Sequence, residues 1–184
     1  MRVIAGKAKG RRLKAPTTGT RPMTDRIRAA LFSSLGDIEG RRVLDLYAGS
    51  GSLGLEALSR GAAEAIFVEN ARDAIFKLRQ NIEETGFTSL ARVEWDDVAS
   101  VLNRTAEERV DLIFVDPPYS MPAAVTRATL ETIVTNGYLS DTGSIVLHRP
   151  AKETPPSPLG LDISWQREYG QSRIYVFIHQ QEPD

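Results

Sequence analysis

The stretch D-L-Y-A-G-S-G-S-L-G, at residues 45–54, constrains the fold of this chain more than any other part of the sequence. It follows a short apolar run and places Gly49, Gly51 and Gly54 in the spacing G-x-G-x-x-G. This spacing after a strand predicts a tight strand-to-helix turn of the kind that binds nucleotide cofactors in doubly wound α/β proteins. A turn without any ligand would need the same glycines, so the neighbouring residues must show whether this turn binds a cofactor.

Short apolar runs alternate with helical patterns from residue 42 onward. Strands are predicted where apolar runs end at turn residues, and helices where apolar residues recur at helical spacing. The predicted strands are 42–47, 65–69, 91–95, 110–115, 144–148, 161–165 and 172–179, and the predicted helices are 51–60, 71–85, a short one between 97 and 108, and 122–136. This order predicts a doubly wound, mostly parallel sheet of seven strands that ends in an antiparallel hairpin.

The N-terminal part of the chain differs in charge and pattern. Short apolar pieces around Gly6 and Gly10 predict a small basic hairpin, and a helix is expected from the N-cap Thr24 to Leu35. The first 42 residues carry eleven Lys or Arg against three Asp or Glu, a charge of +8, and the other twelve basic and twenty-one acidic residues give −9. This asymmetry favours a basic arm that meets a polyanion, although a solvated surface would look the same. We therefore expect an N-terminal extension at residues 1–40 and a main domain at residues 41–184.

The composition narrows the possible chemistry. The chain has no cysteine and only two histidines, His148 and His179, which excludes disulfides, thiolate zinc sites and cysteine nucleophiles and argues against a metal site. No apolar run approaches the ~18 residues of a membrane span, and the basic N-terminus lacks the apolar core of a signal peptide. We therefore expect a cytoplasmic protein whose chemistry depends on carboxylates, backbone groups and a borrowed cofactor.

Two carboxylates near the glycine turn indicate the kind of cofactor. Glu69 ends the next predicted strand, at the spacing at which a carboxylate binds ribose hydroxyls. Asp45 would repel the pyrophosphate of NAD or FAD at the helix N-terminus, but it could pair with the cationic groups of S-adenosylmethionine. Asp97, just past the third strand, could bind the adenine amino group, cap the next helix, or do both. The pattern therefore favours S-adenosylmethionine.

The motif D-P-P-Y, from Asp116 to Tyr119, follows the most apolar predicted strand. In a doubly wound sheet the strands that end at Asp45 and Asp116 should be neighbours, so both turns should open into one crevice. An exocyclic amine that donates to the Asp116 carboxylate and to a carbonyl of the Pro117–Pro118 turn would gain electron density and face a methyl donor. Tyr119 could stack on the base. A plain turn with a packed tyrosine is the alternative interpretation.

These two motifs, together with the segment R-P-M-T-D-R-I-R-A-A-L-F, resemble the bacterial RsmD family. The resemblance extends from R-V-I-A-G near the N-terminus to the late E-Y-G-Q-S-R-I-Y. It implies a class I, Rossmann-like methyltransferase fold and S-adenosylmethionine as methyl donor. It also implies methylation of the exocyclic 2-amino group of a guanine in 16S ribosomal RNA, within an assembling small subunit.

The resemblance and the residue patterns together predict three groups of site residues. The catalytic turn contains Asp116, Pro117, Pro118 and Tyr119. The residues expected to bind the cofactor are Asp45, Tyr47, Ala48, Gly49, Gly51, Glu69, Asn70, Asp97, Val98 and Thr24. The residues expected to bind RNA are Lys7, Lys9, Arg11, Arg12, Lys14, Arg21, Arg26 and Arg28.

Two positions depart from the family pattern. Ala29 stands where a glutamate is expected, and His148 stands where many relatives have glutamate at the end of the fifth strand. We expect His148 to be a surface residue at a strand end rather than part of catalysis.

Three other functions are compatible with parts of the sequence. An amino methyltransferase for another ribosomal base or for DNA adenine would share the D-P-P-Y motif, although the chain lacks a separate domain for reading DNA. A noncatalytic RNA-binding assembly protein could keep an old cofactor pocket, although Asp45, Glu69 and Asp116 argue against it. A nucleotide-dependent oxidoreductase is disfavoured by Asp45.

Overall fold

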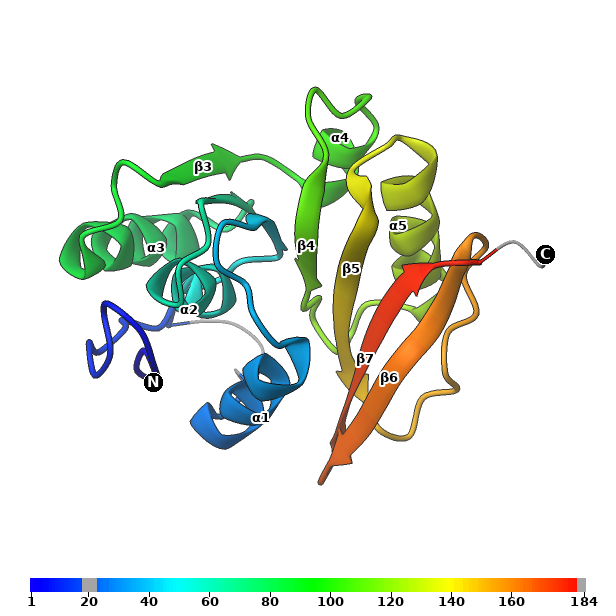
Figure 1. The fold of residues 1–184 in the computed structure, drawn as a ribbon, viewed down its shortest axis with the longest axis horizontal. Coiled ribbons are helices and arrows are strands. Elements are labelled where there is room, and N and C mark those ends of the chain that lie inside the picture. Colours follow the sequence, from blue (N-terminus) through cyan, green and yellow to red (C-terminus); the bar gives the residue numbers. More distant parts are fainter. Residues whose placement is uncertain (18–22, 182–184) are drawn as a thin grey trace.

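The structure, a computed structural model, describes residues 1–17 and 23–181 and contains a seven-stranded sheet with helices on both faces (Figure 1). The strand order is β3-β2-β1-β4-β5-β7-β6, in which β1 to β5 are parallel and β7 runs antiparallel to both β5 and β6. The strands are β1 (Arg42–Leu46), β2 (Glu64–Glu69), β3 (Ala91–Trp95), β4 (Val110–Val115), β5 (Leu139–Pro150), β6 (Leu161–Tyr169) and β7 (Ser172–His179). The helices are α1 (Asp25–Leu35), α2 (Ser52–Ser59), α3 (Arg72–Thr85), α4 (Val98–Leu102) and α5 (Ala123–Thr135).

The predicted mixed sheet and its terminal hairpin are confirmed, and two strands are longer than predicted. β5 begins at Leu139, five residues before the predicted start, because Leu139 already pairs with Val110 of β4. Its polar residues Ser140 to Thr142 interrupt the apolar run from which the start of the strand was predicted. β6 extends to Tyr169 and lies at the edge of the sheet. Most of its residues are exposed, and its sequence includes charged side chains.

Alternation along the central strands divides the buried apolar residues into two clusters, one on each face of the sheet. On one face Val43, Phe67 and Phe114 pack under α1, α2 and α3, with the ring centroids of Phe32 and Phe114 5.7 Å apart. On the other face the intervening residues of the same strands pack under α4 and α5. The sheet is therefore buried on both sides, as its nearly continuous apolar strands require.

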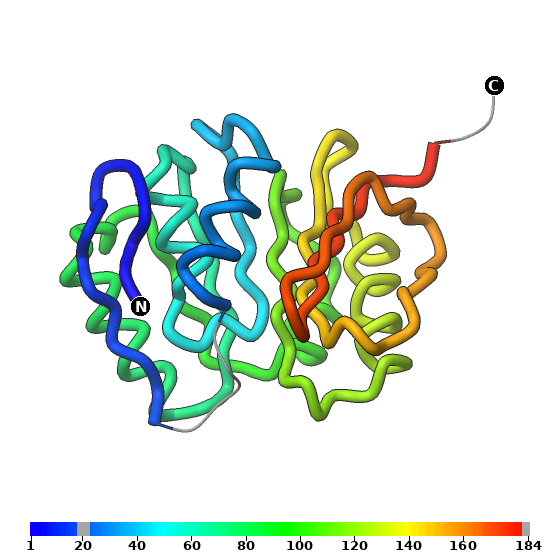
Figure 2. The backbone as a smooth tube through the Cα atoms, turned by 90° about the horizontal axis from the view of Figure 1, so that it is seen from below, coloured from blue at the N-terminus to red at the C-terminus, as the bar shows by residue number. Residues whose placement is uncertain are grey.

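The N-terminal segment forms the predicted small hairpin, closed by an antiparallel bridge between Arg2 and Arg12. Figure 2 shows this segment lying against the side of the molecule that carries α2 and α3. Val3, Ala8 and Leu13 are buried in the same apolar cluster as the residues of these helices. The segment therefore shares the core of the main fold.

Helix α1 begins as predicted. Thr24 is its N-cap, and the Thr24 hydroxyl accepts the N–H of Ile27 at 3.4 Å.

None of the helices in the described part of the chain has the length and apolar character that a membrane span requires.

Candidate active site

The candidate active site lies at the carboxyl ends of β1, β2 and β4, where the chain order of the strands reverses. β1 pairs in parallel with β4, with Asp45 opposite Phe114 and Leu46 opposite Val115. Asp116, the residue after β4, therefore follows the strand beside the one that carries Asp45. The predicted adjacency of the two acidic turns is confirmed, and it matches the position at which open α/β sheets bind ligands.

Asp45 is buried, with 1% of its surface exposed, and its Oδ2 accepts the backbone N–H of Gly54 at 2.9 Å. Gly54 belongs to the first turn of α2, so Asp45 occupies a free amide of the helix N-terminus. Burial raises the pKa of Asp45 well above its usual range, and the negative charges of Asp116 and Glu69 raise it further. A cation placed among these three carboxylates would relieve that repulsion.

The glycine turn between β1 and α2 needs its glycines for two reasons. Gly49 and Gly51 have φ of 55° and 78°, a region that favours glycine, and Tyr47 shares it with φ of 59°. A Cβ on Gly51 would lie 2.4 Å from Leu78 of α3, and one on Gly54 would lie 2.4 Å from the ring of Phe67 on β2. The turn is therefore packed tightly against β2 and α3.

Glu69, at the end of β2, binds three backbone amides. Its Oε2 accepts the N–H of Gly49 at 2.8 Å, and its Oε1 accepts those of Asn70 at 2.9 Å and Ala71 at 2.8 Å. Glu69 thereby fixes the glycine turn to the end of β2. A carboxylate has about four acceptor sites, so Glu69 keeps capacity for one further donor.

Asp97 caps α4, as one of its two predicted roles requires. Its Oδ1 accepts the N–H of Ala99 at 2.9 Å, and its Oδ2 accepts the Asn70 side-chain amide at 3.2 Å. Sequence reasoning missed Trp95 beside it, a residue that is 53% exposed and whose Nε1–H donates to the Asn70 carbonyl at 3.0 Å. An exposed tryptophan at the end of a strand next to Asp97 is the signal that could have identified it.

The D-P-P-Y turn contacts a histidine that we expected at the surface. His148 of β5 is only 2% exposed, and its Nδ1 lies 2.8 Å from Asp116 Oδ1. The Tyr119 hydroxyl lies 3.1 Å from His148 Nε2 and 2.8 Å from the Ser172 hydroxyl at the start of β7. The expectation of a surface residue was wrong, because Asp116 and Tyr119 of the D-P-P-Y turn lie against the two ring nitrogens of His148.

Arg149 supports the same turn and was also missed. Its side chain is almost fully buried and donates to the carbonyls of Pro118 at 3.0 Å and Met121 at 2.7 Å. Glu153 neutralises the guanidinium through two hydrogen bonds at 2.6 and 2.8 Å. The only sequence signal is the spacing of Arg149 and Glu153, four residues apart, which is too common to be informative.

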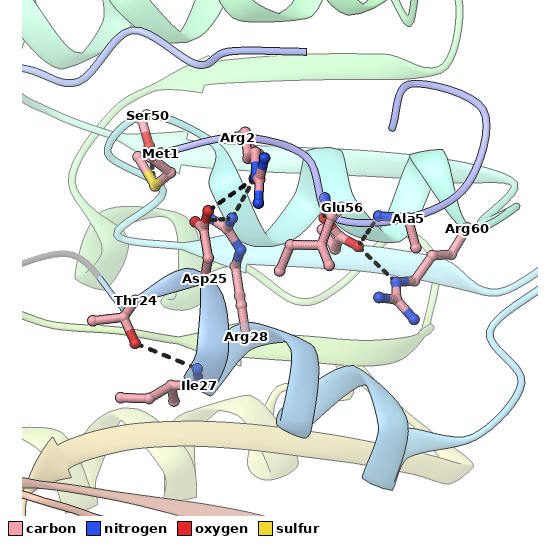
Figure 3. Close-up of polar contacts among 11 residues, drawn as sticks. Met1, Arg2, Ala5, Thr24, Asp25, Ile27, Arg28, Ser50, Glu56 and Arg60 are labelled. Carbon is pink, nitrogen blue, oxygen red and sulfur yellow. Dashed lines mark hydrogen bonds and ion pairs between the residues drawn. The ribbon is translucent and has the colours of Figure 1, made fainter. Parts of the chain in front are cut away.

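The basic hairpin is anchored on α2 through buried polar groups (Figure 3). Glu56 is fully buried and accepts the N–H of Ile4 at 2.7 Å and of Ala5 at 3.1 Å. The Ser59 hydroxyl accepts the N–H of Ala8 at 2.9 Å. The hairpin presents exposed cationic side chains, namely Lys7, Lys9, Arg11, Arg12 and Lys14.

A buried amide joins this hairpin to the glycine turn. Asn81 of α3 accepts the Lys14 N–H at 2.8 Å and donates to the carbonyls of Lys14 and Ser50, both at 2.9 Å. The Asn81 side chain therefore holds both the N-terminal hairpin and the glycine turn.

Arg28 does not lie where an RNA-binding residue should. Its side chain is fully buried and donates to the Arg2 carbonyl and to Asp25, as Figure 3 shows. Burial lowers the pKa of Arg28, although the charges of Asp25 and Glu56 oppose the shift. The prediction of an RNA contact for Arg28 is therefore wrong in this conformation. Arg26 is exposed, and Arg21 lies outside the described residues.

A cavity of about 390 Å³ lies away from this site, beside the short helix α4. None of the predicted site residues lines it; its walls include Arg42, Glu64 and Tyr138.

Within the described ranges, no three His, Asp or Glu side chains are grouped as metal ligands would be.

Comparison with known proteins gives consistent matches over nearly the whole chain. The family model described as "Conserved hypothetical protein 95" matches residues 1–178. The chain is 36% identical to "Putative rRNA methyltransferase YlbH" of Bacillus subtilis, over 96% of this chain and 98% of the relative. It is 34% identical to "Ribosomal RNA small subunit methyltransferase D" of Escherichia coli K12, over 99% and 90% of the two chains.

A solved structure has the same fold. "Putative methyltransferase yhhF from Escherichia coli" superposes with a TM-score of 0.88 at 33% identity and covers 99% of each chain. The predicted class I, Rossmann-like fold is thereby confirmed.

Proposed function

Because the chain belongs to the RsmD family of ribosomal RNA methyltransferases, we propose that it methylates the exocyclic 2-amino group of a guanine in small-subunit ribosomal RNA. The methyl donor is S-adenosylmethionine. The proposal places the enzyme in the cytoplasm, acting on 16S ribosomal RNA during assembly of the small subunit. The observation that carries it is the convergence of Asp45, Glu69 and Asp116 at the ends of three neighbouring strands.

The donor pocket fits a cationic nucleoside better than a phosphate. Asp45 already holds the Gly54 amide, one of the N–H groups with which a helix N-terminus would bind a pyrophosphate. S-adenosylmethionine, when bound, supplies a methyl group on a positively charged sulfur. We propose that Asp45 and the glycine turn hold its cationic part, and that Glu69 accepts from its ribose. Asp97 and Asn70 would then lie near the adenine.

Hydrogen bonding within the D-P-P-Y turn narrows the acceptors that could face the target amine. The Pro118 carbonyl already accepts the Met121 N–H at 2.9 Å and Arg149 Nη1 at 3.0 Å, which uses both of its lone pairs. The acceptors that remain for the amine are Asp116 and the Pro117 carbonyl. We propose that these two draw electron density onto the amine nitrogen and aim it at the methyl group.

The exposed cations of the hairpin would bind the RNA backbone. Their side chains point outward while the hairpin backbone is anchored on Glu56 and Ser59. We propose that residues 1–40 serve as the RNA-binding extension of the main domain at residues 41–184, although the two share one core.

The test is transfer of tritium from labelled S-adenosylmethionine to RNA. Small-subunit RNA from a strain that lacks the gene should accept label, whereas RNA from the parent strain, already methylated, should not. Asp116→Ala should lower kcat by about 10²–10³-fold and leave the affinity for S-adenosylmethionine, measured by calorimetry, nearly unchanged. Mapping the label to an adenine or to DNA would refute the guanine assignment. An absence of S-adenosylmethionine binding would refute catalysis altogether.

A further inference from the structure

Four side chains form a continuous hydrogen-bonded chain that starts at the D-P-P-Y turn. Asp116 Oδ1 contacts His148 Nδ1 at 2.8 Å, His148 Nε2 contacts the Tyr119 hydroxyl at 3.1 Å, and that hydroxyl contacts Ser172 at 2.8 Å. The imidazole and the Tyr119 ring also meet edge to face, with centroids 5.6 Å apart. These hydrogen bonds join the ends of three strands that are far apart in the sequence.

The chemistry of these groups fixes the direction of every hydrogen bond. An ionised Asp116 can only accept, so His148 Nδ1 must carry the proton. In a neutral imidazole, Nε2 is then an acceptor and takes the hydrogen of the Tyr119 hydroxyl. The Tyr119 oxygen must in turn accept from Ser172. Two premises, an ionised Asp116 and a neutral imidazole, therefore set the tautomer of His148.

The exposure of the side chains differs sharply along this hydrogen-bonded chain. The side chain of His148 is 3% exposed, whereas that of Asp116 is 24% exposed. The Asp116 side chain therefore reaches solvent, while its Oδ1 is held by His148. Water has little access to His148 and could not replace its hydrogen bond.

We propose that His148 is a positioning residue that fixes the rotamer of Asp116, so that the second carboxylate oxygen, Oδ2, faces the target amine. This inference rests on the proposed function, because it assumes an amine in front of Asp116. His148 does not touch the substrate. It acts only through Asp116, and Tyr119 and Ser172 hold its ring in place.

The first test does not depend on any substrate. The chain has two histidines, so ¹⁵N NMR of the imidazole nitrogens, with His179→Gln for assignment, resolves the tautomer of His148. We expect the Nδ1–H form in the wild type and a loss of that preference in Asp116→Ala. The Nε2–H form in the wild type would overturn the proposal whether or not the protein methylates RNA.

The second test uses two amide variants that each keep one contact of the imidazole. The amide of His148→Asn can donate to Asp116 in place of Nδ1, whereas the amide of His148→Gln reaches the position of Nε2 near Tyr119. We expect His148→Gln to lower kcat by about 10²-fold, because misplacing a reacting group by about 1 Å has that effect. His148→Asn should keep kcat within about tenfold of the wild type. The KM for RNA and the affinity for S-adenosylmethionine should stay nearly constant in both variants.

His179→Gln is the matched control, because His179 ends β7 at the opposite end from Ser172. It should leave kcat unchanged. Equal losses of kcat in the asparagine and glutamine variants, or a rise in KM that accounts for the loss, would show that His148 is merely structural. If the wild type does not methylate a guanine, the proposed function fails, and the tautomer measurement still decides whether His148 Nδ1 donates to Asp116.

Discussion

The two halves of the candidate active site are held in place by different kinds of groups. In the donor half, Asp45 and Glu69 bind backbone amides of Gly54, Gly49 and their neighbours. In the acceptor half, Asp116 and Tyr119 bind side chains from β5 and β7. The donor half thus depends on the path of the main chain, whereas the acceptor half depends on the identity of distant residues. The following predictions test this difference.

The largest effect on stability is expected from Arg149→Met in the acceptor half. The substitution leaves Glu153, whose side chain is 27% exposed, without its partner, and it leaves the carbonyls of Pro118 and Met121 without the donor that Arg149 supplies. We expect a loss of about 3 kcal/mol in the free energy of unfolding, measured in urea. Arg149→Lys keeps the charge but not the planar fork, so it should recover only part of that loss. Equal stability of both variants and the wild type would contradict the assigned role.

Gly54→Ala tests the donor half. The new Cβ would lie 2.4 Å from the ring of Phe67, and the overpacking should cost about 2 kcal/mol. We also expect weaker binding of S-adenosylmethionine, since the Gly54 N–H that holds Asp45 would move. Gly86→Ala is the control for the loss of a glycine, because a Cβ there meets nothing within 4 Å; only its positive φ of 79° opposes the change. If calorimetry shows unaltered binding in Gly54→Ala, the donor half does not depend on this close packing.

Asp45→Asn should change the pH dependence of the donor half. The folded pKa of Asp45 is raised above the ordinary value of 3.8, so ionisation of Asp45 destabilises the fold as pH rises from that value to the folded pKa. A bound cation favours the ionised form, so the affinity for S-adenosylmethionine should rise with pH in that window, by at most about tenfold per pH unit. Asparagine should abolish this dependence and stabilise the unliganded protein. Calorimetry across pH measures both effects, and a flat profile in the wild type would refute the pairing.

The smallest effect is expected at the surface, outside both halves. Reversing the charges of Lys9, Arg11 and Arg12 should raise the KM for RNA about fivefold and flatten its dependence on salt. The affinity for S-adenosylmethionine should not change. Arg127→Glu on α5 is a control for charge alone. An unaltered salt slope in the triple variant would show that the arm does not bind the RNA backbone.

The same difference explains what could be predicted from the sequence. The glycine spacing and the acid at the end of β2 lie within 25 residues of one another, and their contacts run through main-chain amides. The adjacency of Asp45 and Asp116 followed from the topology of a doubly wound sheet. His148 could not be placed, because its burial depends on contacts with Asp116 and Tyr119, about thirty residues away, and local patterns do not specify such contacts. Arg28 was misassigned because a basic residue in a basic segment gives no sign that it is buried.

The anchoring of the N-terminal hairpin affects how the chain folds during synthesis. Ile4 and Ala5 leave the ribosome before Glu56, which follows them by about fifty residues, and Asn81 follows Lys14 by 67. The nascent arm therefore stays without partners until α2 and α3 have been translated, and contacts of such long sequence separation form late. Docking of residues 3–13 would accordingly be among the last events, and the amides of Ile4 and Ala5 would gain protection from hydrogen exchange only then.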